Sequence, residues 1–172
     1  MKVFIIFGLF ILFALNICAQ DPSVAATKRS EMSKLSSLVG QWKGTGWIKS
    51  GPKREFFNGT ETVQSKIDGL ALLIEGKFAN PEGIVTHETL AVLSPGEKGG
   101  DYRFKTYLAN GISGDQYFKI IPNAFEWGFQ FPGGNIRYTI KIENDTWTET
   151  GEFSRDAKLW IQTFEMTLKK VK

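Results

Sequence analysis

From residue 39 onward, apolar and polar side chains alternate with a period of two, in segments separated by Gly, Pro, Asn or Asp. Such a period places successive side chains on opposite faces of a strand, whereas one face of a helix recurs about every 3.6 residues. Because no long stretch of this region keeps the helical period, we predict an all-β chain. The ten expected strands are residues 40–50, 56–67, 71–79, 85–93, 101–108, 114–121, 124–131, 135–143, 146–153 and 159–171.

The connections between these strands are short and carry turn-forming pairs such as Asp68-Gly69, Asn110-Gly111 and Asn144-Asp145. Parallel neighbours would need crossovers of about a dozen residues, so consecutive strands should pair antiparallel. An open meander would leave two unpaired edges, which closure removes. We therefore expect an antiparallel up-and-down β-barrel of about ten strands, with a short helix at one end.

The amino terminus has the pattern of a secretory signal peptide. Met1-Lys2 precedes an apolar run over residues 3–17, which is shorter than a membrane span and ends before Ala19. Cleavage after Ala19 would give an exported protein, periplasmic or secreted, with no integral membrane span. Lipidation at Cys18 is a weaker alternative, because Ile17 is bulky where a lipoprotein signal needs a small residue. An uncleaved anchor is a third alternative.

After the signal peptide (1–19), we expect a flexible leader over residues 20–32 and a barrel domain over residues 33–172. The spacing of Met32, Leu35 and Leu38 favours a short helix within residues 28–38, with Ser30 as a candidate N-cap. This helix would close one end of the barrel.

Composition excludes several classes of protein. Lys and Arg number 21 against 18 Asp and Glu, a formal charge of +3, and the two signs are interleaved along the chain. Nucleic-acid binders gather positive charge into patches, so we expect no nucleic-acid partner. One Cys and one His exclude a disulfide scaffold, a structural zinc site and a Cys/His nucleophilic pair. Nothing in the sequence indicates an oligomeric state.

A barrel of about eight to ten strands is wide enough to hold an internal cavity. Strand alternation turns one set of side chains inward, and we expect these to line a site for a small apolar or amphipathic molecule. Among them, Glu149 would be a polar contact for the ligand or one half of a buried salt bridge. The candidate lining residues are Tyr102, Phe104, Thr106, Gln116, Trp127, Phe129, Tyr138, Glu149, Trp160, Gln162 and Phe164.

Gly40-Gln41-Trp42, at the start of the first expected strand, resembles the Gly-x-Trp signature of the calycin superfamily. With residues 35–47, 68–70, 151–155 and 164–171, the chain is similar to exported bacterial lipocalin-like proteins of unknown function, and distantly to nitrobindin-type barrels. The resemblance covers about residues 33–172 and implies a barrel with a small helix at one end, but no established activity. In such a barrel we expect Gly40 and Trp42 to be structural, with Trp42 closing one end.

Nitrobindin-type barrels hold haem through a histidine on a late strand, and this sequence has none after His87. We therefore expect no cofactor, with haem bound through His87 as a less favoured alternative. The strand that carries His87 could face the interior in either of two ways. It could turn Val85, His87, Thr89, Ala91 and Leu93 inward, or it could turn Glu88, Leu90 and Val92 inward. No partnered acid–base constellation is evident, so we do not expect an enzyme. A solidly packed barrel acting through its outer face is the alternative to a carrier or sensor.

Overall fold

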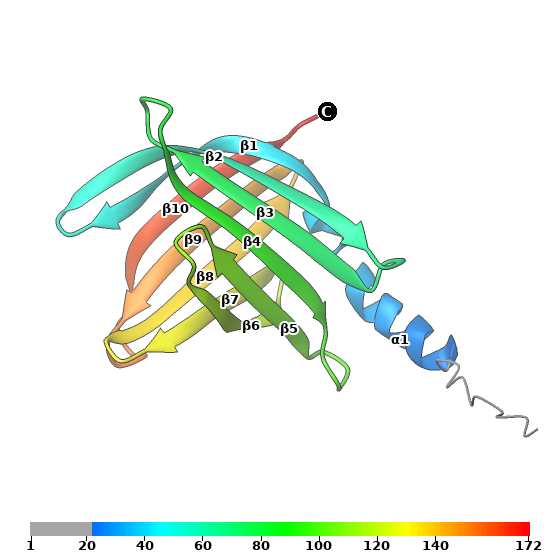
Figure 1. Ribbon diagram of the computed structural model, residues 1–172. Helices are drawn as coiled ribbons and strands as arrows, with labels where there is room; N and C mark the ends of the chain where they lie inside the picture. The colour runs from blue at the N-terminus through cyan, green and yellow to red at the C-terminus, as the bar shows by residue number, and fades with distance from the viewer. Residues whose placement is uncertain (1–21) are drawn as a thin grey trace, which may run out of the picture.

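The computed structural model describes residues 22–172, which form a closed barrel of ten antiparallel strands preceded by a helix (Figure 1). Each strand pairs with its neighbours in sequence, and β1 pairs with β10 to close the sheet. The elements are α1 (Pro22–Ser33), a 3-10 turn (Ser36–Leu38), β1 (Gly40–Ser50), β2 (Lys53–Lys66), β3 (Ala71–Ala79), β4 (Val85–Pro95), β5 (Tyr102–Leu108), β6 (Ser113–Ile121), β7 (Ala124–Phe131), β8 (Gly134–Glu143), β9 (Thr146–Ser154) and β10 (Ile161–Lys170). The expected all-β barrel is confirmed, while the expected signal peptide lies outside the described residues.

Helix α1 overlaps the expected helix over residues 28–33 but begins and ends earlier in the sequence. It begins at Pro22 and ends at Ser33, so most of the expected leader is helical and Ser30 lies inside the helix rather than at its N-cap. Proline is tolerated in the first helical turn, where its missing N–H leaves no helical hydrogen bond unmade. No helix among residues 22–172 is long and apolar enough to cross a membrane.

Side chains from the residues that follow α1 close one end of the barrel. Helix α1 lies beside that end (Figure 1). Leu35 and Leu38 are fully buried there, and the Trp42 side chain packs edge-on against Trp147, with ring centroids 5.6 Å apart. The Trp42 Nε1–H donates a 2.9 Å hydrogen bond to the Leu38 carbonyl, so the indole is buried with its polar group satisfied. Gly40 enters β1 with φ +144°, a conformation that side chains disfavour.

Candidate functional site

Burial of the inward side chains varies along the barrel. Inward residues near α1, such as Leu93 and Leu168, are fully buried. Further from α1, the inward side chains of Phe78, Trp127 and Tyr138 are only partly buried. We call the inner face towards the end opposite α1, where these partly buried side chains lie, the open half of the interior.

Aromatic rings form a nearly continuous lining around this half. The Trp127 and Tyr138 rings stack with centroids 4.2 Å apart and planes 12° apart, and the Phe104 ring meets Trp127 edge-on at 5.5 Å. Tyr138 also meets Phe164 edge-on at 5.5 Å, across Gly151 of the intervening strand. A Cβ at Gly151 would lie 2.6 Å from the Tyr138 ring, so glycine allows these rings to meet. The lining continues through Phe57 to Phe78.

Glu149 is a buried carboxyl at the base of this lining. It faces inward from β9, is 6% exposed, and is held by two indoles. The Trp127 Nε1–H donates to its Oε1 at 2.9 Å, and the Trp147 Nε1–H donates to its Oε2 at 3.1 Å. Burial raises the pKa of Glu149 to about 7, although both indole hydrogen bonds favour the ionised form and oppose that rise.

Glu61 is a second inward carboxyl, 8% exposed, on β2. No hydrogen bond or ion pair joins its side chain to any other residue within 22–172, and its oxygens are not sealed from solvent. The carboxyl lies against Gly76 of the paired strand, where a Cβ would be 2.7 Å from Glu61 Oε1 and 2.7 Å from Thr89 Oγ1. Burial raises the pKa of Glu61 to about 8, and the negative charge of Glu149 adds to the effect.

Sequence reasoning missed Glu61, although a signal for it exists. Phe57, Gly59, Glu61 and Val63 fall on the same face of β2, and all four are buried. The alternation of Phe57 and Val63 would have placed the acid inward, had it been applied to this strand.

Thr106 and Gln116 add polar groups on β5 and β6. The Gln116 Nε2 donates to Thr106 Oγ1 at 3.1 Å, whereas Gln116 Oε1 is buried and has no hydrogen-bond partner among residues 22–172. Phe129, on the same strand as Trp127, is partly exposed and meets the Phe131 ring at 6.2 Å. The structure thus brings nine of the eleven expected lining residues to the inner face: Tyr102, Phe104, Thr106, Gln116, Trp127, Phe129, Tyr138, Glu149 and Phe164.

Trp160 and Gln162 are the two that the expected alternation placed wrongly. The register of β10 against β9 shifts between Gln162 and Phe164, and this irregularity reverses the faces on either side of it. Gln162 is exposed, and its Nε2 donates to Glu165 at 2.8 Å. Trp160 lies outside the barrel, with the Arg137 guanidinium 4.1 Å from its ring centroid.

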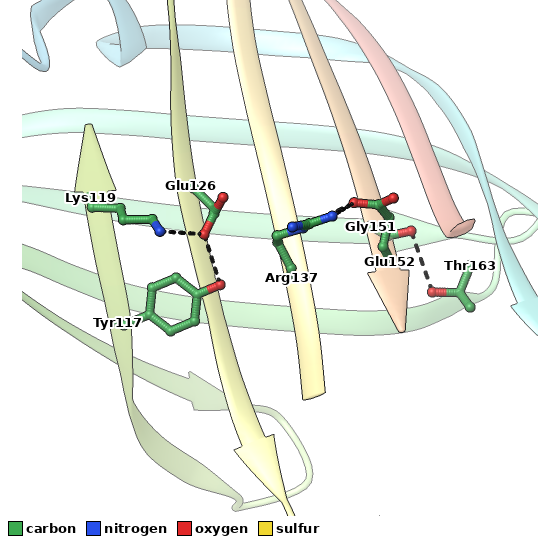
Figure 2. A network of polar contacts seen from close by, with 7 residues as sticks. All are labelled: Tyr117, Lys119, Glu126, Arg137, Gly151, Glu152 and Thr163. Atoms are coloured by element: carbon green, nitrogen blue, oxygen red, sulfur yellow. Dashed lines mark hydrogen bonds and ion pairs between the residues drawn. The ribbon is translucent and has the colours of Figure 1, made fainter. Parts of the chain in front are cut away.

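The outer wall beside Trp160 carries a polar network (Figure 2). Arg137 donates from two nitrogens to Glu152 Oε2, at 3.0 and 2.7 Å. On the neighbouring strands, Glu126 binds the Lys119 ammonium at 2.9 Å and accepts the Tyr117 hydroxyl at 3.2 Å. These charges face away from the interior, so they do not neutralise the two buried carboxyls.

His87 lies at the open end, and its strand adopts the first of the two phases. Ala91 and Leu93 are buried, while Glu88 faces out to an ion pair with Lys77 at 3.5 Å. The His87 ring is exposed and stacks on Phe78 with centroids 5.5 Å apart. Partial burial lowers the pKa of His87. Within residues 22–172, no group of three or more His, Cys, Asp or Glu side chains could hold a metal ion.

Two hollows lie on the outer wall rather than inside. One, of about 560 Å³, crosses β2 to β5 and includes Thr60, Lys77 and Glu88. The other, of about 400 Å³, lies beside Trp47 and Phe56. Neither is lined by Glu61 or Glu149, so the buried carboxyls belong to the interior alone.

Comparisons with known proteins support the architecture. No family model and no curated protein matches the chain. Among solved structures, the chain is similar to the crystal structure of Rv2717c from M. tuberculosis, with a TM-score of 0.63 and 12% identity, covering 83% of this chain and 98% of that one. At this level of identity, the likeness shows a shared barrel fold and no shared activity.

Proposed function

We propose that this protein is an exported carrier or sensor that binds a small apolar or amphipathic molecule in the open half of its barrel. The observation that carries the proposal is Glu61, a buried carboxyl without a protein partner beside an aromatic lining. Binding sites typically combine mostly apolar walls with a few polar groups that orient the ligand. The Gly-x-Trp resemblance at residues 40–42 agrees with a barrel of this kind.

The rim of the open end supports entry of an apolar molecule. Large apolar side chains are exposed on or beside the connections opposite α1, where an isolated globular protein gains nothing from them: Ile84, Val85, Ile112, Phe131, Leu159 and Ile161. They place apolar surface around the end of the barrel through which a ligand would enter. An apolar ligand would thus meet apolar side chains at the entrance as well as along the lining.

General acid–base catalysis is the second candidate, because Glu61 and Glu149 are two buried acids with raised pKa values. We favour binding, since both Glu149 oxygens already accept indole hydrogen bonds. In addition, no Lys or Arg within residues 22–172 forms an ion pair with either acid.

Native mass spectrometry of the full-length protein, purified from its own host, tests the proposal. Thr106→Phe would fill space on the inner wall, while Thr139→Phe adds the same ring to the outer wall and serves as the control. We expect a small molecule retained by the wild type and by Thr139→Phe but lost from Thr106→Phe. No retained molecule, or equal retention by the two variants, would contradict the proposal.

A further inference from the structure

We infer that the bound molecule is a cationic amphiphile, with a protonated amine against the Glu61 carboxyl and an apolar tail along the aromatic lining. The inference rests on the proposed function, since it assumes that the open half of the interior is a binding site. It goes further by fixing the charge and the polar group of the ligand.

The first argument is the missing partner of Glu61. A buried carboxyl needs hydrogen-bond donors or a positive charge, because leaving its charged form unpaired is costly. Its cross-strand neighbours are Gly76, which has no side chain, and Trp42, whose indole N–H donates to the Leu38 carbonyl instead. The nearby Thr89 hydroxyl makes no hydrogen bond to it among residues 22–172. An ammonium group has three donors and one positive charge, and it would satisfy both needs.

The second argument is the sign of the interior charge. The titratable groups that face inward are Glu61 on β2, His87 on β4, Tyr102 on β5, Tyr138 on β8 and Glu149 on β9, with Lys170 on the same face of β10 as Leu168. The Lys170 ammonium lies over Trp42 at the closed end, 5.1 Å from its ring centroid. No cation within residues 22–172 pairs with either acid, so a bound carboxylate would meet no positive partner there, whereas an ammonium group would meet a carboxyl that can ionise to pair with it.

The third argument is the surroundings of the two acids. Trp127 and Tyr138 stack on each other, and their ring faces are electron-rich surfaces that attract cations. The Trp127 indole also binds Glu149, so carboxylate and ring lie together. An alkyl chain on the same amine would pack against Phe104 and Phe164, which extend the lining on either side.

The number of protons released on binding is a second, independent quantity that tests the inference. Burial keeps the pKa of Glu61 near 8, so the isolated protein holds a proton on this carboxyl at neutral pH. An ammonium group pairs with a carboxylate rather than with a neutral acid. Amine binding should therefore release about one proton to the buffer, whereas a neutral alcohol of the same length should release none.

Isothermal titration calorimetry of the full-length protein tests this with three probes of one chain length: n-decylammonium, n-decanol and decanoate. At pH 7, we expect the amine to bind about tenfold tighter than decanol or decanoate, because only the amine forms a hydrogen-bonded charge pair with Glu61. Repeating the titration in buffers of different ionisation enthalpy measures the released proton. This measurement needs only the wild-type protein, so it does not depend on any variant folding.

Glu61→Gln should weaken amine binding about tenfold, abolish proton release and leave decanol binding within about twofold. Glu75→Gln, an exposed acid on the outer face of β3, should behave as the wild type. If decanol or decanoate binds as tightly as the amine, or no proton is released, the inference is wrong although the proposed binding function stands. If none of the three probes binds, the proposed function itself is wrong.

Discussion

Replacing Glu61 with Gln should remove much of the pH dependence of this protein's stability. The pKa of Glu61 rises from 4.5 to about 8 on folding, first because the carboxyl is buried and then because Glu149 is nearby. Between these pH values, the folded protein keeps a proton that the unfolded chain has released. The free energy of unfolding therefore falls as pH rises, by up to about 1.4 kcal/mol per pH unit.

Across the whole interval this amounts to about 5 kcal/mol from Glu61, a large fraction of the roughly 5–15 kcal/mol that stabilises a typical domain. Gln has the same shape but cannot ionise. The difference in unfolding free energy between wild type and variant should therefore change by several kcal/mol between pH 5 and pH 8.5. At pH 5, where the wild-type carboxyl is protonated and also lacks a hydrogen-bond partner, the stability of the variant should lie within about 1 kcal/mol of the wild type.

Urea unfolding followed by tryptophan fluorescence at half-unit intervals from pH 5 to pH 8.5 measures this difference. Glu149 keeps its raised pKa in both proteins, so the free energy of unfolding of both should still fall with rising pH because of that residue. Glu75→Gln is the matched control, because that carboxyl is exposed on the outer wall. Parallel curves for wild type and Glu61→Gln over this range would refute the reasoning, since Glu61 would then not be protonated in the folded state.

Three further experiments test individual contacts. Gly76→Ala should lower the free energy of unfolding in urea by about 1–3 kcal/mol, because its Cβ would lie 2.7 Å from the buried carboxyl. Gly99→Ala is the control, because the atom nearest to its Cβ is 3.9 Å away, and it should change this free energy by under about 0.5 kcal/mol. Trp42→Phe should cost about 1–2 kcal/mol by the same assay, since it removes the N–H that satisfies a buried carbonyl; no loss would contradict that role. A double-mutant cycle on Arg137 and Glu152, whose side chains are 30% and 29% exposed, should give a coupling free energy below about 1 kcal/mol. A larger value would show that solvent screens this ion pair less than its exposure implies.

The fold followed from local features of the sequence. Alternation and turn pairs are repeated in each hairpin, so the strand bounds came out nearly unchanged: β1, β3 and β7 match the expected ranges, while β2 begins at Lys53 rather than at residue 56. The inward positions of Trp127, Tyr138 and Glu149 followed from the same alternation. The register of β10 shifts between Gln162 and Phe164, but the sequence shows no break there. Alternation therefore predicted the wrong face for Gln162.

The arrangement of the site was decided by tertiary structure. Glu61 and Glu149 lie on strands far apart in the sequence, and closure of the barrel brings them close enough for the charge of one to raise the pKa of the other. Glu61 has no partner because of its two cross-strand neighbours: Gly76 has no side chain, and the Trp42 indole donates to the Leu38 carbonyl. Alternation specifies the face of a strand on which a side chain lies, but curvature and register decide which side chains meet, because these depend on the whole closed sheet.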